Sequence, residues 1–251
     1  MPLTKRVIAR LDIKGPNLVK GIHLEGLRVL GKPEEFAEYY YRHGADELMY
    51  MDVVASLYER NSLTEMIKKT ASKIFIPLTV GGGLRTIDDM RSALLAGADK
   101  VSLNTAAIRD PDLVRKASRY FGSSTIVVSI EAIKQPDGKY LAYIDNGREY
   151  TGVEVYAWAE RVQELGAGEI VLTSVDREGT GLGYDLELLR GVANRVSIPV
   201  VACGGAGHVG HVVMALKESN VDAVAVASIL HYDYISKHSV SGDFSKEGNT
   251  E

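Results

Sequence analysis

The chain has 251 residues, of which 45% are hydrophobic and 25% charged, and its formal net charge is −4. This balance argues against a broadly basic surface, so we expect no nucleic-acid partner and no membrane partner. The single cysteine, Cys203, excludes an internal disulfide and any metal site built from several cysteines. A lone cysteine is typical of a reduced setting, so we expect a cytoplasmic protein. The histidines show no metal-ligand spacing, so we expect no metal, and we expect no other cofactor.

Short apolar segments typical of buried strands recur eight times along the chain, and segments with helical spacing separate them. The predicted strands cover residues 6–11, 47–52, 75–80, 100–104, 125–130, 169–174, 199–203 and 223–228. The clearest predicted helices cover residues 32–44, 86–98, 111–122 and 153–168. At this length, eight alternations of strand and helix predict an α/β fold, a closed (β/α)8 TIM barrel. An open doubly wound sheet is the alternative, but no GxGxxG motif follows the first strand.

The second half of the chain repeats the first. The aligned pairs are GADELMYMD (44–52) with GAGEIVLTS (166–174), IPLTVGGG (76–83) with IPVVACGG (198–205), and IARLD (8–12) with VVSIE (127–131). The repeat predicts one barrel over residues 1–232, built from half-barrels of about 1–121 and 122–232. A polar tail is expected over residues 233–251.

The last of these alignments pairs Asp12 with Glu131, each at the end of a predicted strand. Strands one and five lie opposite each other in an eight-stranded ring, so both carboxylates should face the C-terminal mouth of the barrel. Such a pair can act as acid and base if burial, or the charge of the other group, raises one pKa. The alternative is that the two acids cap nearby helix N-termini.

Two kinds of turn recur in both halves and suggest two phosphate sites. Glycines follow the third and seventh strands at 81–83 and 204–207, and hydroxyl-bearing turns follow the fourth and eighth strands at 104–105 and 227–228. Glycine lets the backbone approach a ligand closely, although tight turns alone also require it. The glycine-punctuated segment 14–31 at the same mouth is a candidate lid, or else a small surface hairpin.

The motifs RVIARLDIK, DELMYMDVVAS, PLTVGGG, GADKVSLNTAA, GAGEIVLTSVDREGT and GGAG resemble the cyclase subunit of imidazole glycerol phosphate synthase, from the start of the chain to about residue 232. The resemblance implies a reaction in histidine biosynthesis. Ammonia adds to a ribulosyl-formimino aminoimidazole carboxamide ribonucleotide that carries a phosphate at each end. The products are imidazole glycerol phosphate and an aminoimidazole carboxamide ribonucleotide. A glutaminase subunit docked on the N-terminal face would form a heterodimer and supply the ammonia through the barrel.

The resemblance also implies roles for individual residues. Asp12 matches the catalytic base, Glu131 the catalytic acid, and Lys20 lies on the closing lid. The positions that match phosphate and substrate contacts are Gly83, Asn104 and Thr105 at one end, and Glu178, Gly179, Gly205, Ala227 and Ser228 at the other. The positions that match a salt-bridged ammonia gate at the barrel floor are Arg6, Glu47, Lys100 and Glu169.

The sequence departs from the family pattern at three places. Glu131 and Glu178 stand where the family has aspartate, and no final helix is recognisable after the segment at 231–238. These departures leave three other functions open. One is an ammonia-channelling homologue that supplies a sugar amidotransferase in surface polysaccharide biosynthesis. The others are a sugar-phosphate isomerase, and a non-catalytic scaffold that activates a glutaminase.

Overall fold

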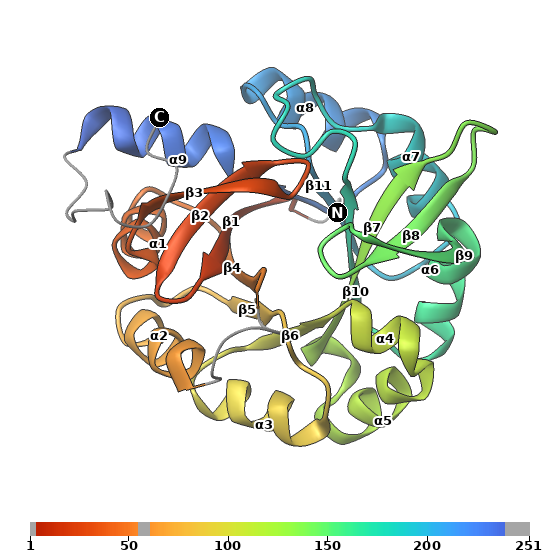
Figure 1. The fold of residues 1–251 in the computed structure, drawn as a ribbon, viewed down its shortest axis with the longest axis horizontal. Coiled ribbons are helices and arrows are strands. Elements are labelled where there is room, and N and C mark those ends of the chain that lie inside the picture. Colours follow the sequence, from red (N-terminus) through yellow and green to blue (C-terminus); the bar gives the residue numbers. More distant parts are fainter. Residues whose placement is uncertain (1–3, 55–60, 239–251) are drawn as a thin grey trace.

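The computed structural model describes residues 4–54 and 61–238. Eight parallel strands close into a barrel, because β12 pairs back to β1 (Figure 1). Around the ring they are β1 (Arg6–Lys14), β4 (Glu47–Asp52), β5 (Leu78–Gly81), β6 (Lys100–Leu103), β7 (Ile126–Lys134), β10 (Glu169–Ser174), β11 (Val200–Cys203) and β12 (Ala223–Val226). The predicted TIM barrel is therefore confirmed.

Helices lie around the outside of the strands (Figure 1). They are α1 (Pro33–Arg42), α2 (Asn61–Ala71), α3 (Ile87–Leu95), α4 (Thr105–Arg109), α5 (Pro111–Phe121), α6 (Val155–Glu164), α7 (Leu186–Ala193), α8 (Val209–Glu218) and α9 (Ser228–Lys237), with a 3-10 turn, η1, at Ser123–Thr125. Within residues 4–54 and 61–238, none of these helices has the length and apolar character needed to span a membrane.

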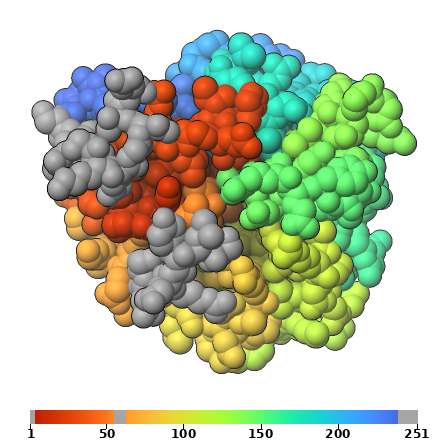
Figure 2. All heavy atoms as spheres, viewed as in Figure 1, coloured from red at the N-terminus to blue at the C-terminus, as the bar shows by residue number. Residues whose placement is uncertain are grey.

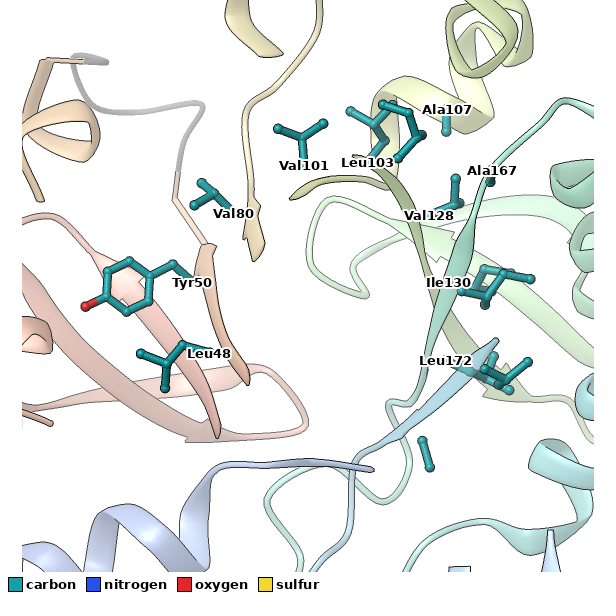
Figure 3. Close-up of a cluster of buried hydrophobic side chains, with 14 of the residues drawn as sticks. Leu48, Tyr50, Val80, Val101, Leu103, Ala107, Val128, Ile130, Ala167 and Leu172 are labelled. Carbon is teal, nitrogen blue, oxygen red and sulfur yellow. The ribbon is translucent and has the colours of Figure 1, made fainter. Parts of the chain in front are cut away.

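Side chains alternate between two apolar layers along each strand, as the pleat requires. On β7, Val128 and Ile130 belong to the layer between strands and helices, part of which Figure 3 shows. Val127 belongs to a separate cluster inside the barrel lumen, so Ser129 and Glu131 share its inward face. The alternation that builds the core therefore also turns the acid at the strand end into the mouth.

Two hairpins extend the barrel at its mouth, one in each half. β1 is followed by β2 (Asn17–Ile22) and β3 (Glu25–Gly31), and β7 is followed by β8 (Tyr140–Ile144) and β9 (Glu149–Glu154). The first hairpin is the candidate lid segment. The sequence prediction missed the second, because the turn-rich stretch after Glu131 conceals two short strands.

Several predicted boundaries were wrong by a few residues. β5 begins at Leu78 rather than at Phe75, because Pro77 has no amide for a strand ladder. β12 ends at Val226, and the predicted strand residue Ser228 instead begins α9. This helix contains the segment 231–237 and continues past residue 232, where the predicted tail boundary lay. Most of the predicted tail, residues 239–251, falls outside the described part of the chain.

Candidate active site

Asp12 lies in a buried network of charges at the mouth of the barrel. Its Oδ1 accepts a hydrogen bond from Nε of Arg10 over 2.9 Å, and its Oδ2 lies 3.7 Å from Nζ of Lys20. Lys20 reaches this position from β2 and also donates a short hydrogen bond to Glu178, which follows β10. Two cations and two anions thus compensate one another out of contact with water.

The same contacts set the ionisation of Asp12. Burial alone would raise the pKa of this carboxyl. The charges of Arg10 and Lys20, together with the hydrogen bond from Arg10, outweigh burial and hold the pKa below its ordinary value. Asp12 is therefore ionised at neutral pH and can accept a proton.

Glu131 is buried in a different environment. The backbone amide of Gly147, in the turn between β8 and β9, donates a hydrogen bond to its Oε2 over 2.7 Å. Burial is the dominant influence and raises the pKa of Glu131 to about 7, against the lowering effects of the Gly147 amide and the Arg10 charge. At neutral pH a large share of molecules therefore keeps a proton on this carboxyl. The two carboxyls share one mouth but have pKa values displaced in opposite directions, as an acid–base pair requires.

A cavity of about 470 Å³ opens over the half of the mouth formed by β4 to β7. Glu131 lines it together with three predicted phosphate-contact residues, Gly83, Asn104 and Thr105. Gly83 and its neighbour Gly82 adopt φ values of +68° and +96°, which favour glycine and turn the backbone around this space. The structure therefore brings one of the two predicted phosphate-site sets into an open cavity.

The second set lies in the other half of the mouth, and none of its members lines this cavity. There the β2–β3 hairpin folds down onto the loop after β10. The amide of His23 donates to the carbonyl of Glu178 over 2.8 Å, and the His23 ring contacts the carbonyl of Val175 at 2.8 Å. A Cβ on Gly179 would lie 2.5 Å from the Gly21 carbonyl oxygen, so only glycine permits this approach. Gly205 is buried against the carbonyl of Gly183.

The hairpin also meets the opposite half of the barrel. Nδ2 of Asn146, in the β8–β9 turn, donates to the carbonyl of Leu24 over 3.0 Å. Figure 2 shows the two hairpins approaching each other over the centre of this face. The candidate lid, which carries Lys20, thus covers Asp12, whereas the cavity beside Glu131 stays open.

The hydroxyl-bearing turns of the two halves have matching backbones. Asn104 precedes α4 with φ −127° and ψ −84°, and Ala227 precedes α9 with φ −127° and ψ −79°. Neither residue caps its helix with a side-chain hydrogen bond. The repeat read from the sequence therefore extends to the backbone conformation of the two turns.

A ring of charged side chains lies at the opposite end of the lumen. Arg6 donates to Oε1 of Glu47 at 2.6 Å and to Oε1 of Glu169 at 2.5 Å. Nζ of Lys100 lies 3.0 Å from Oε2 of each of the same two carboxylates. The structure thus brings the four residues together as a closed ring of alternating charge, and their role as an ammonia gate stays a prediction.

Comparison with known proteins connects this arrangement to a family. A sequence profile described as "Histidine biosynthesis protein" matches residues 6–236. The chain belongs to this family. Three relatives are each named imidazole glycerol phosphate synthase subunit HisF. The relative from Legionella pneumophila is 58% identical over 202 residues, covering 80% of this chain and 95% of its own.

The other two HisF relatives cover nearly the whole chain. The protein from Methanopyrus kandleri is 46% identical over 266 residues, with 99% of this chain and 98% of its own covered. The protein from Bacillus cereus is 47% identical over 230 residues, with 92% and 91% covered. The resemblance to the cyclase subunit that the sequence motifs suggested is therefore confirmed.

Two members of the site were not among the residues predicted for it. Arg10 is buried against Asp12, and Gly147 holds Glu131. Arg10 could have been found from the alternation of β1, because it stands between Ile8, which faces the lumen, and Asp12. Gly147 carried no comparable signal, since its contact depends on the unpredicted hairpin.

Proposed function

We propose that this chain is the cyclase subunit of imidazole glycerol phosphate synthase. It uses glutamine-derived ammonia to convert the ribulosyl-formimino substrate into imidazole glycerol phosphate and aminoimidazole carboxamide ribonucleotide. The observation that carries the proposal is the pair Asp12 and Glu131, two inward-facing carboxyls whose pKa values the protein moves in opposite directions. Membership of the histidine biosynthesis family supports the same reaction.

The two carboxyls divide the proton transfers between them. Asp12, held ionised by Arg10 and Lys20, accepts the proton that the ammonia nitrogen loses as it bonds to substrate carbon. Glu131, with a pKa of about 7, donates a proton to the group that leaves when the substrate is split. Substrate that fills the open cavity beside Glu131 would displace water there and keep it from competing for the proton transfer.

A substrate with a phosphate at each end would use both sets of residues that we predict to bind phosphate. One phosphate would lie in the open cavity at Gly83, Asn104 and Thr105. The other would lie among the residues of the second half, beneath the β2–β3 hairpin that carries Lys20. The reacting part of the substrate would then lie between Asp12 and Glu131. The hairpin acts as the lid in this scheme and opens for entry and release.

The floor of the barrel is the face that a glutaminase subunit would cover. Phe75, in the loop before β5, is 86% exposed, and Leu95, at the end of α3, is 81% exposed. Phe75 and Pro77 also line a second cavity, of about 340 Å³, at this face. Exposed aromatic and aliphatic anchors beside a pocket are typical of interface centres. Ammonia released there would meet the four-residue ring and then the apolar lumen.

The comparisons support none of the three other functions considered, namely sugar amidation, sugar-phosphate isomerisation and scaffolding. The ring at the floor also argues against an isomerase, which has no use for a charged gate between lumen and floor.

The proposal is tested by incubating the purified chain with the ribulosyl substrate and excess ammonium salt, without any partner. We expect substrate absorbance to fall as both products form. If the substrate is stable under these conditions, the cyclase proposal is wrong. If Glu131→Asp then restores turnover, the longer acid is the cause of that failure. If neither form turns over, the scaffold function gains support.

A further inference from the structure

Arg10 crosses the interior of the barrel at the base of the mouth, where it also lines the cavity beside Glu131. The residue starts from β1 and is 4% exposed. Its Nη1 donates to Oγ1 of Thr173 on β10 over 3.3 Å and lies 3.2 Å from Sγ of Cys203 on β11. Since β11 and β12 lie between β10 and β1 in the ring, the side chain spans the lumen rather than following one wall.

The Nε edge of this guanidinium is directed at Asp12. Nε donates to Oδ1 of Asp12 over 2.9 Å, while the contacts of Nη1 with Thr173 and Cys203 fix the plane of the group. Guanidinium is protonated throughout the working pH range, so the charge beside Asp12 is permanent. Oδ2 of Asp12 faces Lys20 instead, which lies on the β2–β3 hairpin, the candidate lid.

Below Arg10 the described side chains of the buried lumen cluster are largely apolar, and Glu178 attracts the Arg10 charge from farther away than Asp12 does. The buried cluster there is apolar apart from the weakly polar thiol of Cys203, and it consists of Ile8, Met49, Val127, Val171, Val201, Cys203, Ala223 and Ala225. A cation buried among apolar side chains lowers the stability of the fold unless it is paired. A protein with an apolar side chain of similar size at this position would often be at least as stable. Among the described contacts, Asp12 is the one carboxylate that accepts a hydrogen bond from Arg10. A contribution to stability alone therefore does not account for arginine at this position.

We propose that Arg10 is a positioning residue for the catalytic base. From inside the lumen it orients Oδ1 of Asp12 and keeps this carboxylate ionised when the Lys20 hairpin lifts away. The inference rests on the proposed function, in which Asp12 is the base. Since the base acts on ammonia from either source, loss of Arg10 must affect ammonium-dependent and glutamine-dependent turnover alike.

The pH dependence follows from the charges around Asp12. Arg10 lies on its own strand, Lys20 on β2, Glu131 on β7 and His231 on α9, and Glu178, after β10, pairs with Lys20. Removal of the Arg10 charge raises the pKa of Asp12, so the acidic limb of the pH–rate profile moves to higher pH. The same charge lowers the pKa of Glu131, so the basic limb moves in the same direction.

The experiment compares Arg10→Gln and Arg10→Lys with the original chain, using ammonium salt alone and glutamine with the glutaminase partner. For Arg10→Gln we expect kcat to fall about a hundredfold with both nitrogen sources, with little change in KM. We expect the acidic limb of the pH–rate profile to move to higher pH by about 1 to 2 pH units. Arg10→Lys restores the charge and should recover part of both effects. Cys203→Ala, which removes one contact of Nη1 but leaves the Asp12 pair, is the matched control.

A ¹³C titration of the Asp12 carboxyl supplies a readout that does not depend on turnover. If its pKa is the same in Arg10→Gln as in the original chain, the inference is overturned. A loss confined to glutamine-dependent turnover also overturns it, because Arg10 would then act on the passage of ammonia. If the original chain has no cyclase activity but the Asp12 pKa still rises in Arg10→Gln, the proposed function fails while the electrostatic role of Arg10 stands. Should Arg10→Gln fail to fold, the titration of Arg10→Lys decides. Because lysine keeps the charge, we expect the Asp12 pKa in Arg10→Lys to stay close to that of the original chain, and a large rise would overturn the inference.

Discussion

The amide of Gly147 donates a hydrogen bond to Oε2 of Glu131 over 2.7 Å, and this contact fastens the β8–β9 turn to the proposed catalytic acid. Gly147 has φ +78°, and a Cβ there would lie 3.3 Å from Val175 and 3.6 Å from Leu24. The turn therefore lies between the acid and the hairpin that covers the base. The position of Glu131 depends on packing that involves both hairpins.

Gly147→Ala should weaken this hydrogen bond, because alanine resists the left-handed conformation and presses on Val175. The amide lowers the pKa of Glu131, so its loss should raise that pKa above about 7 and move the basic limb of the pH–rate profile upward. Gly138→Ala is the matched control, since Gly138 has φ +86° with no neighbour within 4 Å of a Cβ. Equal shifts in both variants would show that backbone strain, and not the contact with Glu131, is responsible.

Glu131 should act in its protonated form. Its pKa is raised to about 7, so the acid is available below that pH, and ammonium-dependent kcat/KM should decline as the pH rises through about 7. Glu131→Gln cannot donate a proton, and we expect a loss of about a hundred- to ten-thousandfold that no pH restores. A steady-state pH series on the two proteins checks this. Persistence of the basic limb in Glu131→Gln would assign that limb to another group.

Lys100→Met should separate the two nitrogen sources. The substitution removes the two 3.0 Å ion pairs of Lys100 and leaves Glu47 and Glu169 with Arg6 alone. Glutamine-dependent turnover should change several-fold, since partners left in a buried ion-pair network rearrange. Ammonium-dependent turnover should stay near its original value, because ammonium salt reaches the mouth directly. Lys73→Met, which breaks an exposed pair with Glu38, is the control. A parallel fall with both nitrogen sources would remove the gate assignment.

Phe75→Ala should weaken binding of the glutaminase without affecting the cyclase reaction. An aromatic anchor at an interface centre contributes about 2 kcal/mol or more, so we expect roughly a thirtyfold rise in Kd. Isothermal titration with the partner measures this, and ammonium-dependent turnover reports on the intact mouth. Tyr150→Ala, at the 61% exposed tyrosine of β9, removes a comparable ring at the mouth. An unchanged Kd in Phe75→Ala would move the interface elsewhere.

The sequence was sufficient for the architecture because the strand–helix alternation and the half-chain repeat are strong, regular signals. The same regularity explains why Asp12 and Glu131 could be expected to face the lumen: each stands at an inward position where its strand reaches the mouth, two or three residues before the strand ends. The features that could not be predicted from the sequence depend on contacts between distant segments of the chain. The β8–β9 hairpin, the hold of Gly147 on Glu131 and the order of the two pKa values all arise only when residues far apart in the chain meet.

The position of Arg10 could be predicted from the sequence only in part. Its place in IARLD already implied an inward-facing side chain between Ile8 and Asp12, but a charge was not expected in the lumen. The identity of its partners, Thr173 and Cys203, required the closed barrel, because they lie on strands more than 160 residues further along the chain.

The matching turns at Asn104 and Ala227 have a consequence for how a two-ended molecule enters the mouth. If each phosphate meets the same backbone shape, the phosphates alone do not determine which end goes where. The orientation of the substrate must then depend on the features that differ between the two halves of the barrel. One difference is between the proposed base, Asp12 on β1, and the proposed acid, Glu131 on β7. The other is between a hairpin held down by the Lys20–Glu178 pair in one half and an open cavity in the other half. The similar turns of the two half-barrels would thus provide two similar phosphate contacts, and the differences between the halves would determine the orientation of the substrate.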